Sequence, residues 1–423
     1  YGNVELNIAG GIFHCAVFGG GYGVGDAQER GSTTVETLVN MARVYGQSTV
    51  NITGGTFLND VFGGGDRAVI ENTGNNATLL TISEQADIRG SVFGGGNGER
   101  LRPATQAFAP EDGYTQHPEW VGMVLGNTQV KLTGNAKHTP WVYGDLFGGG
   151  NLAQVRGNTD VNITAGNLAG QVFGGGNGDL TAGIVTSADV WGNTHVTLAA
   201  NETTTNPSAI QVVWNRLWDK TKQIFYAWDP TIDDPADEPS TEDVVYDRER
   251  FFVNNTFLNP HNIYGGGNLA CKVGTYVDAE GQATTQPVKG TGLATVNVQQ
   301  GLTSADLLQT TAWKQAYANE DEPHFSVFGG GYGQHTYVGS TQVTAHVADV
   351  FNNNSTEAIT DFDPTMGMPQ RTLVEIVGGS FKGSVIANTQ VVVDGQTWTH
   401  RVFGGGYGDI TSLTDNTTGQ VGG

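Results

Sequence analysis

Acidic side chains follow several Gly-rich turns of this chain, at Asp66, Glu99, Asp179 and Asp409. Carboxylate and carbonyl oxygens are the ligands that Ca²⁺ prefers in proteins. The segments that end at Asp179 and Asp409 read Gly-Gly-x-Gly-Asp, which is one residue short of the spacing in calcium-binding β-roll repeats. Two interpretations stay open for these acids: ligands of structural Ca²⁺, or solvated loop side chains.

A pair of carboxylates could cleave a glycosidic bond, one as general acid and the other as base or nucleophile. The run Asn158-Thr159-Asp160 matches part of the polygalacturonase pattern. Other copies of the same segment have Gln129 or His195 in place of Asp160, which indicates a variable, solvent-facing position. The histidines form no HxH or HxxxH pair, and there is no GxSxG elbow. We therefore expect no catalytic residues.

Aromatic side chains gather in the least repetitive segment, residues 201–259. The part from Ile210 to Trp228 suits a short helix or a hairpin that packs on the flank of the fold, because buried aromatics are common core residues. A ligand-binding platform is the alternative. Its candidate residues are Trp214, Trp218, Tyr226 and Trp228.

The only cysteines are Cys15 and Cys271, too few for a disulfide framework and without the spacing of a metal site. Free cysteine is usually buried, so we expect two buried thiols. A single long-range disulfide is the alternative.

Composition excludes several classes of protein. The chain has 423 residues, 63 of them glycine, and a formal charge of −22, so nucleic acid and anionic membranes are unfavourable partners. No apolar run is long enough to span a membrane. The hydrophobic fraction of 38% is too high for a disordered Gly-rich chain. A packed core must exist.

A repeat explains the glycine content. An aliphatic residue, an aromatic residue and three glycines occur together eight times, and most copies continue with Asn or Tyr. The segment Val374–Phe381 resembles Val50–Phe57 and predicts a ninth, degenerate coil. The aliphatic positions of the eight copies are Val17, Val61, Val92, Leu146, Val172, Ile263, Val327 and Val402.

An alternating segment, Gly-x-x-x-Val-x-Ile, precedes these copies and predicts a strand with one buried face. The shortest period, from Leu146 to Val172, contains three short β-branched pieces separated by Gly and Asn bends. This pattern predicts an all-β fold, a parallel β-helix (a three-sided β-solenoid) with loop insertions. Residues 1–200 and 260–423 would form one stack, with 201–259 inserted on it.

The glycines and asparagines of the repeat have structural interpretations in such a fold. Glycine accepts positive φ and has no Cβ that could clash in a bend, so we expect the triple glycines to make the bend in each coil. The asparagines that follow would stack into a ladder along the solenoid. They are Asn97, Asn151, Asn177 and Asn268.

The VFGGGN/Y element and its GNTxVxI/L strands resemble bacterial β-solenoid surface proteins and autotransporter-like adhesins, particularly large repeat proteins of the Bacteroidota. The resemblance implies a right-handed parallel β-helix, an extracellular or cell-surface location, and a structural or adhesive role. Its implied partners are a surface glycan, or a protein of a host or neighbouring cell. A carbohydrate-active β-helix enzyme, either a polysaccharide lyase or a glycoside hydrolase, is the alternative function.

Both ends of the chain lie in the repeat. Tyr1-Gly2-Asn3 begins in the alternating segment, and that segment is next due at Gln420–Gly423. Open strand edges invite pairing with another chain. We therefore expect either a segment of a longer solenoid or end-to-end self-association into a filament.

Overall fold

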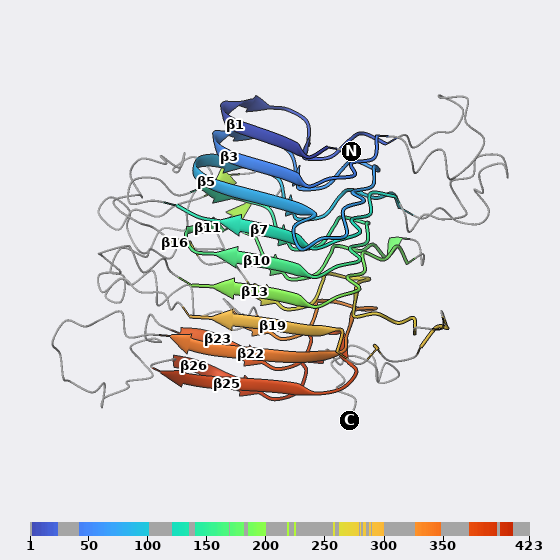
Figure 1. Ribbon diagram of the computed structural model, residues 1–423. Coiled ribbons are helices and arrows are strands. Elements are labelled where there is room, and N and C mark those ends of the chain that lie inside the picture. The colour runs from blue at the N-terminus through green and yellow to red at the C-terminus, as the bar shows by residue number, and fades with distance from the viewer. Residues whose placement is uncertain are drawn as a thin grey trace, which may run out of the picture.

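The computed structural model shows a stack of parallel strands (Figure 1). It describes residues 2–23, 42–100, 121–134, 140–168, 170–181, 185–199, 218–219, 224–225, 257–258, 262–278, 280, 282–284, 287–288, 290–299, 326–347, 372–395 and 398–408. The elements assigned in these ranges are all strands. No helix in them is long and apolar enough to cross a membrane. The predicted three-sided parallel β-solenoid is confirmed.

Three parallel sheets run along the stack. The longest has twelve strands: β1 (Val4–Phe13), β3 (Ser48–Phe57), β5 (Thr78–Ile88), β7 (Thr128–Leu132), β8 (Trp141–Val142), β10 (Thr159–Ile163), β11 (Gly166–Leu168), β13 (Thr194–Leu198), β16 (Phe257–Leu258), β19 (Leu293–Val298), β22 (Ser340–Val347) and β25 (Thr389–Gly395). The second has nine: β2 (Val17–Phe18), β4 (Val61–Phe62), β6 (Val92–Phe93), β9 (Leu146–Phe147), β12 (Val172–Phe173), β17 (Asn262–Tyr264), β20 (Ser326–Phe328), β23 (Thr372–Val377) and β26 (Trp398–Phe403). The third contains β18 (Lys272–Val273), β21 (Tyr337–Val338) and β24 (Ser384–Val385).

The aliphatic residues before the glycines form a single column, as the constant spacing predicts. Each one pairs in register with its copy in the next coil, because the same path is repeated at every turn of the solenoid. In order the column is Val17, Val61, Val92, Leu146, Val172, Ile263, Val327, Ile376 and Val402.

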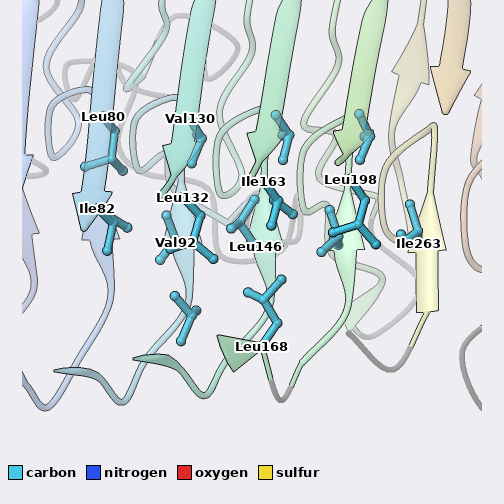
Figure 2. Packing of buried hydrophobic residues seen from close by; sticks show 14 of the residues in the cluster. Leu80, Ile82, Val92, Val130, Leu132, Leu146, Ile163, Leu168, Leu198 and Ile263 are labelled. Carbon is cyan, nitrogen blue, oxygen red and sulfur yellow. The ribbon is translucent and has the colours of Figure 1, made fainter. Parts of the chain in front are cut away.

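The interior is built from such columns. Alternate residues of the long sheet point inward, and Figure 2 shows Ile82, Leu132, Ile163 and Leu198 following one another from strand to strand. All four are 0% exposed. Because each apolar side chain lies against its copy above and below, a coil buries its core only when it has neighbours.

The aromatic residue of each repeat belongs to a second column of stacked rings. Phe147 and Phe173 stack with their centroids 4.7 Å apart, and Phe173 and Tyr264 at 4.9 Å. Offset or stacked aromatic pairs add stabilisation beyond the area they bury. The column contains Phe18, Phe62, Phe93, Phe147, Phe173, Tyr264 and Phe328.

Of the two expected reasons for the triple glycines, the positive φ is wrong and the need to avoid a Cβ clash is right. None of the triple glycines in the described residues has positive φ; left-handed backbone follows the ladder residue in some coils, for example at Leu152 and Leu269 (φ 53° and 55°). What demands glycine is the spacing between coils. A Cβ on Gly149 would lie 2.7 Å from the backbone nitrogen of Gly176 in the next coil. The Gly149 N–H also donates to the Gly175 carbonyl at 3.0 Å.

The degenerate coil exists, but its alignment with Val50–Phe57 is wrong. Ile376 pairs with Val327 on one side and Val402 on the other, so β23 belongs to the nine-stranded sheet. Gly378 and Gly379 therefore occupy triple-glycine positions, with Ser380 in the third place. The resemblance to Val50–Phe57 arose because both segments carry an alternating apolar run before two glycines.

Strands on either side of residues 201–259 pair directly. β12 pairs with β17, and β13 pairs with β19. Within this segment the structure describes an antiparallel pair, β14 (Trp218–Asp219) with β15 (Ile224–Phe225), which corresponds to the hairpin alternative. At the end of the segment, β16 pairs with β11 and so belongs to the twelve-stranded sheet.

Candidate functional site

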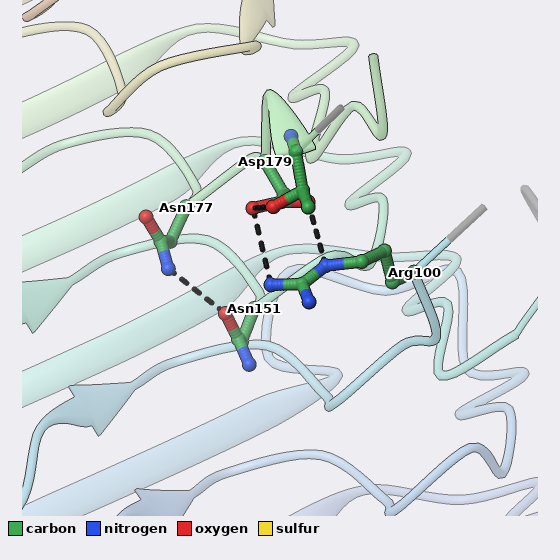
Figure 3. A network of polar contacts seen from close by, with 5 residues as sticks. Arg100, Asn151, Asn177 and Asp179 are labelled. Atoms are coloured by element: carbon green, nitrogen blue, oxygen red, sulfur yellow. Dashed lines mark hydrogen bonds and ion pairs between the residues drawn. The ribbon is translucent and has the colours of Figure 1, made fainter. Parts of the chain in front are cut away.

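The turns that follow four of the triple glycines carry the predicted asparagine ladder, part of which Figure 3 shows. Each Nδ2 donates to the Oδ1 of the preceding coil: Asn151 to Asn97 at 3.0 Å, and Asn177 to Asn151 at 2.9 Å. Asn268 continues the series by donating to Asn177 at 2.9 Å. All these bonds point the same way, because every amide has the same orientation.

Asp66 ends this ladder. Its Oδ1 accepts a hydrogen bond from Asn97 Nδ2 at 3.0 Å, and the two residues pair in the same column. A carboxylate is the strongest acceptor available for the terminal amide. Asp66 is therefore equivalent to the asparagines, two residues earlier in its repeat than the other acids.

Glu99 and Asp179 lie beyond the ladder position. Asp179 Oδ2 lies 2.6 Å from Arg100 Nε, and Thr181 Oγ1 donates to Asp179 Oδ1 at 2.8 Å (Figure 3). Burial raises the pKa of Asp179, but the hydrogen bonds from Thr181 and the charge of Arg100 outweigh it, so the net shift is downward.

No group of three His, Cys, Asp or Glu side chains that could hold a metal occurs within the described ranges. Asp409 lies outside those ranges. The structure thus brings Asp179 together with a cation from the chain itself, Arg100, which comes from a turn 79 residues earlier.

The aromatic candidates fall almost entirely outside the described residues. Trp214, Tyr226 and Trp228 are outside them, and only the backbone of Trp218 is described, paired with Phe225. The binding platform stays a prediction.

The two cysteines differ in exposure and neither forms a disulfide. Cys271 is buried, and burial raises the pKa of its thiol to about 12. Cys15 is exposed, so the expectation that both are buried is wrong for this residue. Cys15 lies between β1 and β2, which among the described residues pair with β3 and β4.

A thiol reagent should therefore modify Cys15 rapidly in the native protein and leave Cys271 unmodified, because the thiolate is the reactive form. Titration with Ellman's reagent should release one equivalent before unfolding and two afterwards. Release of no thiol in denaturant would reveal a Cys15–Cys271 disulfide and contradict the structure.

Two hydrogen-bonded rows were missed by the sequence interpretation. Thr128 Oγ1 donates to the carbonyl of Gly148 at 2.6 Å, across the interior of one coil. At the corner, Asn158 N donates to Asn127 Oδ1 at 2.8 Å. The sequence feature that could have indicated both rows is the Asn-Thr pair that follows the corner glycine, as in Gly126-Asn127-Thr128. The hydroxyl bond recurs from Ser48 to Gly63, Thr78 to Gly94, Thr159 to Gly174, Thr194 to Gly265 and Thr341 to Gly378.

The outer face of the long sheet carries the residues considered for catalysis. Asp160 pairs in register with Gln129 and His195, which confirms that these are equivalent positions. Gln129 Nε2 donates to Asp160 Oδ2 at 2.7 Å, and His195 Nε2 lies 2.8 Å from Thr197 Oγ1. The positions on either side of Asp160 thus hold an amide and an imidazole, whereas glycosidases use two carboxylates.

A row of positions that contains two acidic residues, Asp60 and Asp145, directly precedes the nine-stranded sheet and was also missed from the sequence. Asp60 Oδ1 accepts the Ser91 N–H at 2.8 Å, as Asp145 Oδ1 accepts the Gln171 N–H at 2.8 Å. Burial raises the pKa of Asp60; the Ser91 N–H lowers it, and the charge of Asp145 raises it again, for a net upward shift. An amide oxygen could accept the same backbone hydrogen bond as the carboxylate does.

Asp60→Asn should therefore stabilise the protein at neutral pH. The folded pKa of Asp60 lies above its unfolded value, so its carboxylate destabilises the fold once the pH rises through the folded pKa. Asparagine keeps the acceptor without the charge, and the gain should disappear near pH 4, the ordinary range of aspartate. Thermal unfolding of the unmodified protein and of Asp60→Asn, from near pH 4 to neutral pH, measures this gain in stability. Asp179→Asn, with the opposite pKa shift, should instead destabilise at neutral pH.

No family model, curated protein or solved structure matches this chain. Its function must therefore be inferred from its own residues and geometry.

Proposed function

We propose that the chain is an extracellular structural and adhesive scaffold, acting as a segment of a larger surface protein or in a head-to-tail filament. The observation that carries this proposal is the use of the recurring polar side chains. The side chains of Thr128, Asn151 and Asn127 all bond within or between coils. The recurring hydroxyl and amide side chains of the repeat thus stabilise the stack.

The adhesive part of the proposal concerns surfaces outside these rows. A surface glycan, or a protein of a host or neighbouring cell, would contact Trp214, Trp218, Tyr226 or Trp228. Aromatic rings combine a large apolar area with polar edges, which suits them to such interfaces. The resemblance to Bacteroidota-type surface proteins and adhesins supports the same role.

Two measurements test the proposal. Antibodies against the chain should label intact source cells, and the purified protein should bind a glycan array or whole cells. Deletion of Ile210–Asp229 should abolish that binding, whereas Thr295→Ala on the outer face of β19 should preserve it. Unlabelled intact cells, or binding that survives the deletion, would contradict the location or the binding residues respectively. Cleavage of polysaccharides would support the carbohydrate-active enzyme instead.

Structural Ca²⁺ at Asp66, Glu99, Asp179 or Asp409 has a separate test. A bound ion stabilises the state that binds it, so added Ca²⁺ should raise the unfolding temperature and EDTA should reverse the effect. Asp179→Asn should weaken this response, since the cation would compete with Arg100 for the carboxylate. If the unfolding temperature does not change with Ca²⁺, the calcium site is contradicted. These acids are then side chains of the ladder, of an ion pair or of solvated loops.

A further inference from the structure

The side of the solenoid that carries β18 holds a carboxyl group between coils. Asp189 Oδ1 accepts the backbone N–H of Lys272 in the next coil at 2.8 Å, and Ser187 Oγ donates to Asp189 Oδ2 at 3.2 Å. Asp189 directly precedes Val190, which pairs with Val273 and is 0% exposed. A neutral carboxyl group can keep both bonds, because its carbonyl oxygen and its hydroxyl oxygen each accept.

An acceptor without a partner lies beside this carboxyl group. Val155 and Val190 pair in register, so Gln154 of one coil is equivalent to Asp189 of the next. Gln154 is 8% exposed, and its Oε1 is buried with no hydrogen-bond partner among the described residues. An amide oxygen only accepts, and a buried acceptor that stays unpaired costs free energy. The missing partner of Gln154 is therefore a donor, which the ionised form of Asp189 does not supply.

The charges near Asp189 do not compensate for its burial. Lys272 and Arg156 bring positive charge to this carboxyl group, and Cys271 and Tyr276 are the titratable side chains on which its own charge acts. Burial raises the pKa of Asp189 and outweighs the hydrogen bond from the Lys272 N–H and the two positive charges, so the net shift is upward. The site thus favours the neutral carboxyl group more than water does.

A short hairpin begins beside the same carboxyl group. Val277 and Ala283 pair antiparallel in it, and Lys272 Nζ lies 5.7 Å from the centroid of the Tyr276 ring. The Tyr276 hydroxyl is buried with no partner in the described part of the chain, and its pKa is raised first by burial and then by the charge of Asp189. Burying a neutral carboxyl group costs less than burying a charged one, so docking of this hairpin depends on the protonation of Asp189.

We propose that Asp189 forms a proton-dependent hydrogen bond between coils: its protonated carboxyl group donates to Gln154 Oε1, and its ionised form does not. The proton is the ligand of this site, so no other reactant is needed. The carbonyl oxygen of the neutral group still accepts the Lys272 N–H. The inference goes beyond the scaffold proposal by giving the fold a response to pH.

The direction of this response follows from the shift of Asp189. Its pKa is higher in the folded chain than in the unfolded chain, so folding takes up a proton between the two values. The contribution to stability is therefore complete below the unfolded pKa of Asp189 and is lost as the pH rises through the folded pKa. Acid conditions stabilise this side of the solenoid and the hairpin that begins beside Tyr276.

Hydrogen exchange of residues 272–278, followed by mass spectrometry, tests this inference. Asp189→Asn keeps an oxygen for the Lys272 N–H and supplies a permanent donor for Gln154 Oε1. At neutral pH, residues 272–278 should exchange more slowly in this variant than in the unmodified chain. Near pH 4, the ordinary range of aspartate, the two proteins should exchange alike. Comparison at equal pH removes the intrinsic pH dependence of exchange.

A double-mutant cycle tests the partner. Gln154→Leu removes the acceptor, so the slowing caused by Asp189→Asn at neutral pH should shrink in this background. Asp60→Asn is the matched control, because it neutralises another carboxyl group with a raised pKa at a different corner. It should leave the exchange of residues 272–278 unchanged.

Three results would overturn the inference. Exchange in Asp189→Asn that is equal or faster at neutral pH would mean that the ionised carboxylate is already satisfied, with the Gln154 amide nitrogen turned towards it. An undiminished effect of Asp189→Asn in the Gln154→Leu background would exclude Gln154 as the partner. Equal slowing by Asp60→Asn would trace the effect to overall stability instead of this bond.

Discussion

Gly149→Ala should destabilise the solenoid far more than a single added methyl group would suggest. The new Cβ would lie 2.7 Å from the Gly176 nitrogen and 2.9 Å from the Gly175 carbonyl carbon, both backbone atoms. Relief requires the coils to separate, which also strains the bonds from Gly149 N to Gly175 O and from Gly95 N to Gly149 O, each 3.0 Å. Overpacking and two weakened hydrogen bonds together should lower the free energy of unfolding by about 2–6 kcal/mol.

Denaturant unfolding measures this loss, and Gly10→Ala is the matched control. A Cβ on Gly10 would meet nothing within 4 Å, and its φ is not positive. The same substitution there should be neutral or stabilising by about 0.4–1 kcal/mol through the unfolded chain. Equal shifts in the two variants would show that coil spacing is not the reason for the glycine.

The columns of the fold could be predicted because they depend on short, constant intervals. The 15 residues from Gly157 to Val172 recur at Gly2 to Val17, and equal paths place equal residues in register. The source of the clash that the triple glycine avoids could not be predicted in the same way. It is the neighbouring coil, and the distance to that coil is not contained in the local sequence.

The candidate site was less predictable because its partners come from other coils. Asp179 meets Arg100 only when the chain returns to the same side of the solenoid two coils later. Asp66 was grouped with Glu99 and Asp179 by residue type, yet its register places it with Asn97. A carboxylate that follows a glycine turn can therefore end a ladder or hold an arginine, and sequence spacing alone does not separate these roles.

Phe173→Ala should lower the free energy of unfolding by about 3–5 kcal/mol, the range for truncation of a buried aromatic ring. Phe173 is 0% exposed and stacks on two rings, Phe147 at 4.7 Å and Tyr264 at 4.9 Å, within 4° and 10° of parallel. Neither neighbour can close the gap, because both are held in register by the same sheet.

Phe403→Ala is the matched control, since Phe403 follows Val377 in the same sheet but is 37% exposed in the last coil. Its loss should be smaller, below about 2 kcal/mol, because the site is open to water on one side. Denaturant midpoints of both variants give the comparison. If Phe173→Ala left the midpoint unchanged, the ring column would contribute no stability, and the alternation that places Phe173 inside the stack would be wrong.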